Sequence, residues 1–145
     1  MNSQPEERRP GEWAEPLPKN CPPPEAYKPH FALFYRFVAT SPPSANDFLS
    51  YCALHPQKEF RDKECQARAL SLVDDKAEAF NRVRKLPVLK GKKVASIVLP
   101  PESGLILMTG KPHRHHFSWW LRAGFDPVPI CCIVSSESDG DGGGE

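Results

Sequence analysis

The residues best suited to chemistry lie in one short stretch, from Gly110 to Trp120. It reads Gly-Lys-Pro-His-Arg-His-His-Phe-Ser-Trp-Trp and holds three of the five histidines and two of the three tryptophans in the 145-residue chain. Imidazoles ligate metals or move protons near neutral pH, cations bind phosphate, and indole rings stack on flat ligands. We consider three interpretations of this stretch.

The first interpretation is a metal site built from His113, His115 and His116. In an extended strand, however, His116 would face away from the other two histidines. The chain also lacks a Cys-x-x-Cys or His-Glu-x-x-His motif that would supply further ligands at the required spacing. We therefore predict no metal site.

The second interpretation is a cleft that binds or cleaves an anionic, nucleotide-like ligand. The cations of the stretch would hold phosphate, a tryptophan would stack, and His116 would donate a hydrogen bond or act as an acid or base. Arg36 lies in an otherwise apolar run and would complete the cleft, unless it simply pairs with a carboxylate at a sheet edge. The predicted ligand-binding residues are Arg36, Lys111, Arg114 and Trp119, and the predicted catalytic residues are His116 and Ser118.

The third interpretation is structural. Alternation along a strand would direct Phe117, Trp119 and Leu121 into a core, while His116, Ser118 and Trp120 would face outward. The histidines would then only cover a sheet edge.

A second candidate site is a run of cations between Glu78 and Glu102 that contains no acid. Such a cluster favours binding to nucleic acid or to another protein as a non-enzymatic adaptor. It lacks the interleaved aromatic residues of single-strand binders, and cations also suit the C-terminal end of a helix. The cluster consists of Arg82, Arg84, Lys85, Lys90, Lys92 and Lys93.

Composition divides the chain into three parts. Residues 1–30 hold eight of the seventeen prolines, and residues 135–145 contain only Ser, Glu, Asp and Gly. Both segments lack the apolar side chains needed to offset the entropy of ordering, so we predict a disordered Pro-rich leader and a disordered acidic tail. Residues 31–134 then form one domain, whose fifteen Lys and Arg against nine Asp and Glu give a net charge of +6.

The pattern within this domain predicts an α+β fold with two helices and a largely antiparallel sheet. The helices are expected after Ser44, over about ten residues, and over 75–86, with acidic residues in their first turns. The strands are expected at 31–38, 69–73, 94–99, 105–109, 117–121 and 128–134, the last with Pro129 at its start or on an edge. Helices placed early and consecutive strands placed late argue against a parallel sheet.

The five cysteines are odd in number and show no zinc-ligand spacing, so we predict free thiols in a reducing compartment. No apolar run approaches the length of a membrane span or of a signal peptide. These features predict a soluble, cytoplasmic protein, with any protein partner left undefined.

Part of the pattern resembles a set of small bacterial proteins that have no established activity. The shared features are Phe34-Tyr35-Arg36, Pro42-Pro43 before Asp47-Phe48, and a late strand like Gly-His-x-Thr-x-Trp, matched here by His116-Phe117-Ser118-Trp119.

An aromatic-Arg opening strand is also distantly similar to ADP-ribosyltransferase-like domains, including RES-type toxins that consume NAD. This resemblance implies that Arg36 contacts a phosphate or ribose of NAD, with Ser71 or Ser118 near the nicotinamide ribose. The late catalytic Glu of those enzymes has no good counterpart, since Glu102 lies in a Pro-Pro-Glu-Ser-Gly turn. The fold can therefore carry over without the chemistry.

Overall fold

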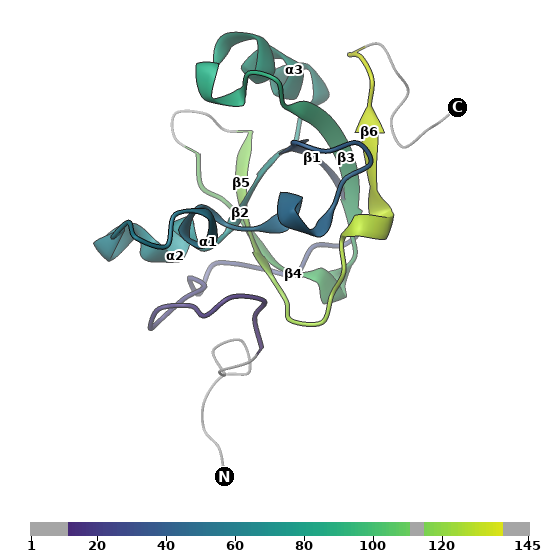
Figure 1. Cartoon of the computed structure of the whole chain (residues 1–145). Helices are drawn as coiled ribbons and strands as arrows, with labels where there is room; N and C mark the ends of the chain where they lie inside the picture. The colour runs from purple at the N-terminus through teal and green to yellow at the C-terminus, as the bar shows by residue number, and fades with distance from the viewer. Residues whose placement is uncertain (1–11, 111–114, 138–145) are drawn as a thin grey trace.

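The structure, a computed structural model, describes residues 12–110 and 115–137. They form one small α+β domain built on a single six-stranded sheet, as the sequence predicts (Figure 1). The strands are β1 Ala32–Val38, β2 Leu70–Val73, β3 Lys93–Leu99, β4 Gly104–Met108, β5 His116–Leu121 and β6 Cys131–Val134. The α-helices are α1 Tyr51–Leu54, α2 Glu64–Ala67 and α3 Lys76–Lys85.

Every strand pairing is antiparallel, and the order across the sheet is β4-β5-β2-β1-β3-β6. β6 is an edge strand, and Pro129 precedes it in a 3₁₀ turn at Val128–Ile130, where its missing N–H costs no ladder bond. β1 pairs with β3 from Ala32–Leu99 to Val38–Lys93, whereas its ladder with β2 consists of the Tyr35–Val73 pair. The sheet therefore opens between β1 and β2 beyond Tyr35.

Local sequence explains where the helices begin. Asp75 caps α3 by accepting a hydrogen bond from the backbone N–H of Glu78 at 2.8 Å. The first predicted helix is divided into a 3₁₀ turn at Ala45–Phe48 and the short α1. Ser50 causes this break, because its hydroxyl accepts from the N–H of Ala53 and starts a new helix.

Side chains pack on both faces of the sheet. One face carries the main core, which includes Phe34, Leu72, Ile97, Phe117 and Trp119. The other face holds two separate apolar clusters. One lies beneath α3 and includes Tyr35, Val73 and Ala79, and the other surrounds Trp120.

The cluster around Trp120 is covered by the described part of the leader, residues 12–30, which we call the strap. Trp13 of the strap is 8% exposed, and Tyr27 forms an antiparallel bridge with Ile106 of β4. The prediction of a disordered leader is therefore wrong for residues 12–30. Residues 1–11, and the predicted tail from residue 138 onward, lie outside the described residues.

The strap is also held covalently. Cys21 forms a disulfide with Cys65 of α2, with 5.6 Å between their Cα atoms, and Cys52, Cys131 and Cys132 are free. The prediction of five free thiols is thus wrong. Because disulfides persist mainly in oxidising compartments, the bond weighs against the reducing compartment inferred from the cysteine count. Within the described chain, no helix is long and apolar enough to cross a membrane.

Candidate ligand groove

A groove of about 530 Å³ opens where β1 and β2 separate. Its floor is a polar row of the sheet. Ser71 of β2 and Ser118 of β5 are direct partners in the ladder, and both line the groove together with His116. Ala69, just before β2, and Val73 of β2 flank Ser71 in sequence, and they belong to the Trp120 cluster and the α3 cluster respectively. The polar row therefore interrupts the apolar surface between the strap and α3.

The floor side chains form a hydrogen-bonded chain. His116 Nε2 lies 3.2 Å from Ser71 Oγ, and His116 Nδ1 lies 3.1 Å from Thr109 Oγ1. Thr109 Oγ1 in turn lies 2.7 Å from Ser118 Oγ. These contacts fix the plane of the imidazole ring and leave Ser71, which is exposed, at the solvent side of the chain.

Arg36 fills the opening between the two strands. Its Nε donates to the carbonyl of Asp47 at 3.0 Å, and its Nη1 donates to the carbonyl of Ser71 at 2.8 Å. The guanidinium lies 5.5 Å from the centroid of the Phe48 ring. Burial lowers the pKa of Arg36 to about 10, against the opposing influence of Cys131 and Asp47. Arg36 therefore lines the groove while its guanidinium is occupied in joining β1, β2 and the Ala45–Phe48 turn.

Asp47 completes this support. Burial pushes its pKa up, but hydrogen bonds from the Thr40 hydroxyl and from the N–H groups of Ala39 and Ser44 outweigh burial and leave the pKa lowered. The alternative in which Arg36 pairs with a carboxylate at a sheet edge is thus wrong, because β1 is an interior strand. Its side-chain nitrogens donate to main-chain carbonyls, including that of Asp47, in the sheet interior.

The walls of the groove combine apolar and cationic side chains. Tyr51 is 50% exposed, and its ring centroid lies 5.7 Å from that of Phe60. Lys63, at the start of α2, and Lys92, before β3, are exposed or partly exposed cations of the lining. Among the described lining residues there is no Asp or Glu. The described part of the lining therefore presents positive charge without an opposing carboxylate.

The strap holds the wall formed by α1 and α2 in place. Glu15 accepts hydrogen bonds from the N–H of Ser50 at 2.9 Å and from the Ser50 hydroxyl, and it pairs with Arg68 at 3.2 Å. Trp120 Nε1 donates to the carbonyl of Cys65 at 2.9 Å. Together with the disulfide, these contacts tie both short helices to the sheet.

The structure brings three of the predicted site residues together and places a fourth, Trp119, in the core. Arg36, His116 and Ser118 line the same groove. Trp119 is 0% exposed, packs in the main core and donates its Nε1–H to the carbonyl of Ser103. The predicted stacking role of Trp119 is therefore wrong. Lys111 and Arg114 lie outside the described residues.

The structural interpretation of the same stretch is correct for one face and wrong for the other. Phe117, Trp119 and Leu121 do belong to the main core. Trp120, expected to face solvent, is 1% exposed because the strap covers it. His115 lies outside the groove lining and contacts Asp74, with 2.8 Å between Nδ1 and Oδ1.

The six-cation cluster is less available than its sequence indicates. Arg82 pairs with Glu78 at 2.9 Å, and Arg84 pairs with Glu137 at 3.3 Å. The four lysines of the cluster, Lys85, Lys90, Lys92 and Lys93, are exposed and form no ion pair with any described residue. Lys92 belongs to both candidate sites, because it also lines the groove.

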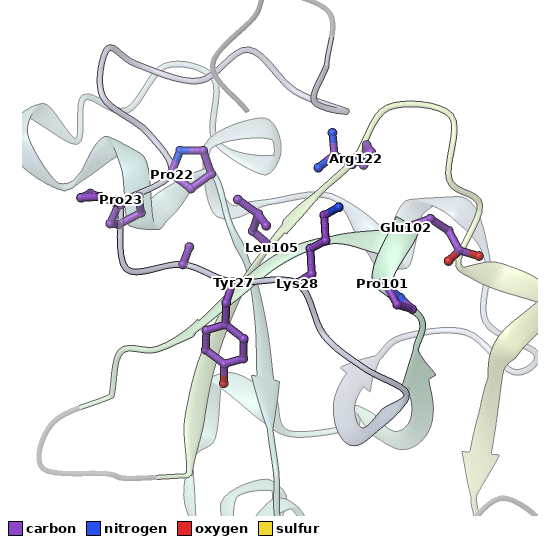
Figure 2. Close-up of a pocket in the computed structure, with 10 residues that line it drawn as sticks. Pro22, Pro23, Tyr27, Lys28, Pro101, Glu102, Leu105 and Arg122 are labelled. Atoms are coloured by element: carbon purple, nitrogen blue, oxygen red, sulfur yellow. The ribbon is translucent and has the colours of Figure 1, made fainter. Parts of the chain in front are cut away.

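A second hollow, of about 730 Å³, lies under the strap (Figure 2). It is lined by Tyr27 and Lys28 of the strap, by Arg122 after β5, and by Glu102 of the turn before β4. Arg122 is already engaged, since it pairs with Glu12 and lies 4.9 Å from the centroid of the Trp13 ring. Glu102 thus lies in a different hollow from Arg36 and His116, which removes it as the late acid of an ADP-ribosyltransferase-like site.

The sequence does not single out Lys63 and Tyr51, which line the groove, or Thr109, which contacts His116. Lys63 and Tyr51 lie far from His116 in the sequence, and only folding brings them into the groove that His116 also lines. Among the described residues no group of three or more His, Cys, Asp or Glu side chains is arranged to hold a metal ion.

No family model matches the chain, and no curated protein or solved structure shows significant similarity to it.

Proposed function

We propose that the groove binds a small nucleotide-like ligand that carries phosphate. The observation that carries this proposal is the lining itself, which places Lys63 and Lys92 around a hydroxyl and imidazole floor without a described carboxylate. Charge-assisted hydrogen bonds from lysine to phosphate are stronger than neutral ones, and an acid in the groove would oppose them.

The remaining parts of such a ligand also find suitable neighbours. Tyr51 and Phe60 offer aromatic surface for a base, and the exposed hydroxyl of Ser71 can bond a sugar hydroxyl. The volume, about 530 Å³, lies within the range of roughly 300–1,000 Å³ that is typical of small-molecule sites. ADP-ribose and NAD are the ligand type that the opening strand implies, with Arg36 as a support of the groove instead of its phosphate contact.

A thermal-shift screen of the full chain tests this proposal. ADP-ribose, NAD and ATP are added separately, and a ligand that binds the folded state stabilises it by about 2.7 kcal/mol at a hundred times Kd. We expect a rise in Tm with at least ADP-ribose that is lost in the Tyr51→Ala and Lys63→Ala variants. The absence of any rise at millimolar ligand contradicts the proposal.

A second candidate function is nucleic-acid binding through Lys85, Lys90 and Lys93. Its support is that all three are exposed, from the end of α3 to the start of β3, and form no ion pair with a described residue. Binding to phosphate backbones releases counterions, so affinity falls steeply as salt rises. Binding of short RNA or DNA that weakens at least tenfold between 50 and 200 mM salt, on the order expected for several phosphate contacts, favours this function over the groove.

A further inference from the structure

Two hydroxyls contact the groove imidazole, and the exposed one belongs to Ser71. Ser71 Oγ lies 3.2 Å from His116 Nε2 and is exposed to the groove. A nucleophilic serine needs a base within about this distance to accept its proton. Ser118, by contrast, is 2% exposed, and its hydroxyl is engaged by Thr109.

The opposite side of the imidazole ring defines which nitrogen can act as the base. When Nδ1 carries the proton, it donates to Thr109 Oγ1, and Thr109 donates onward to Ser118 Oγ. In this tautomer Nε2 is unprotonated and accepts from Ser71. Thr109 thus occupies the place that a carboxylate fills in a Ser-His-Asp triad.

Two further features suit this arrangement to a phosphate ester. Arg36 Nη1 donates to the carbonyl of Ser71, which holds the main chain of that residue where the β1–β2 ladder ends. Lys63 and Lys92 line the same groove and can offset charge on phosphoryl oxygens.

We propose that Ser71 is a nucleophile that cleaves phosphate esters, with His116 as its general base and Thr109 as a positioning residue. This inference rests on the proposed ligand groove. In the first step the bond from Ser71 Oγ to phosphorus forms while the bond from phosphorus to the leaving alcohol oxygen breaks. His116 Nε2 takes the serine proton and gives it to the leaving alkoxide.

In the second step water attacks the phosphoserine diester or monoester. His116 takes a proton from the water and returns it to Ser71 Oγ as the oxygen–phosphorus bond breaks. The net reaction is hydrolysis of one ester bond, and the enzyme groups return to their starting states. No oxidant, reductant or other co-reactant is required.

The test is covalent labelling of the full chain with a fluorophosphonate probe, read by intact mass and by peptide mapping. We expect one adduct, on Ser71, formed with release of fluoride. Ser71→Ala abolishes it, and His116→Gln slows it by at least about a hundredfold, the lower range for loss of a general base. Ser135→Ala, at an exposed position outside the groove lining, keeps the adduct on Ser71, and the exposed Ser41 stays unlabelled as an internal control.

Thr109 is tested by rescue. Thr109→Val slows labelling, and Thr109→Ser, which restores the hydroxyl, returns the rate to within about threefold. Circular dichroism and Tm confirm that each variant is folded, and the exposed position of Ser71 makes Ser71→Ala a mild change.

Labelling no faster than that of the urea-unfolded chain overturns the inference, as does an adduct on Ser118 or Ser41. The same variants separate it from the proposed function. If Ser71→Ala binds ADP-ribose and the wild-type chain does not label, the ligand groove stands and the nucleophile fails. If Ser71 labels but no nucleotide binds, the ligand class fails and the nucleophile stands.

Discussion

Nη1 of Arg36 donates a 2.8 Å hydrogen bond to the main-chain carbonyl of Ser71, at the point where the ladder between β1 and β2 ends. The guanidinium thereby donates to a carbonyl that a backbone N–H of β1 would otherwise pair with in a continued ladder. The separation of the strands creates the groove, and Arg36 keeps that separation from exposing unpaired polar groups to the core. One buried cation therefore links the architecture of the sheet to the presence of the groove.

Replacing Arg36 should destabilise the fold. Arg36→Met leaves the carbonyls of Ser71 and Asp47 without these donors, and we expect a loss of about 2–4 kcal/mol in the free energy of unfolding. Denaturation in urea measures it. Arg84→Ala is the matched control, because its exposed pair with Glu137 should contribute less than about 1 kcal/mol. Equal effects of the two variants would show that Arg36 is not a structural link.

The carboxylate of Asp47 should make stability depend on pH. Its folded pKa lies below the ordinary value of 3.8, so its contribution is complete above that value and disappears as pH falls through the lowered folded pKa. Asp47→Asn should cost about 1–3 kcal/mol at pH 7 and progressively less below pH 4, since the protonated acid also lacks charge. Urea denaturation of both proteins across pH 2–7 checks this, and a constant difference across the range would count against it.

The disulfide should stabilise the domain through the strap. Cys21 and Cys65 are separated by 44 positions, and we expect the double variant Cys21→Ser/Cys65→Ser to lose about 2–4 kcal/mol. The exposed free thiol Cys132 provides the control, and Cys132→Ser should change stability by less than about 0.5 kcal/mol. Thiol titration of the unfolded, unreduced chain should find the three free cysteines, and finding all five would refute the bond.

The strands and α3 can be predicted from the sequence because their signals are local. Alternation or continuous apolar runs identify β1 to β6, and the cap at Asp75 fixes the start of α3. The division of the first helix is local as well, but it depends on Ser50, whose capping role competes with helix continuation.

The other parts that the sequence does not predict depend on long-range contacts. The strap has few apolar residues, yet Trp13 and Cys21 find a partner surface in Trp120 and Cys65. Trp119 and Trp120 differ only in which face of β5 they occupy, and the strap buries the second face. His116 and Ser118 can be identified by residue type. Thr109, in contrast, reaches His116 only through strand pairing, and Lys63 joins the groove lining only through the placement of α2.

The most direct test of the central claim is calorimetric titration of ADP-ribose into two matched double variants. Lys63→Ala/Lys92→Ala removes both groove cations, and Lys85→Ala/Lys90→Ala removes two exposed lysines outside the groove, so net charge is the same in both. We expect the groove variant to bind at least about a hundredfold more weakly than the wild-type chain, as for two lost charge-assisted contacts, and the control to change by less than about threefold. Equal weakening in both variants, or no binding to the wild-type chain, would contradict a specific anion-binding groove.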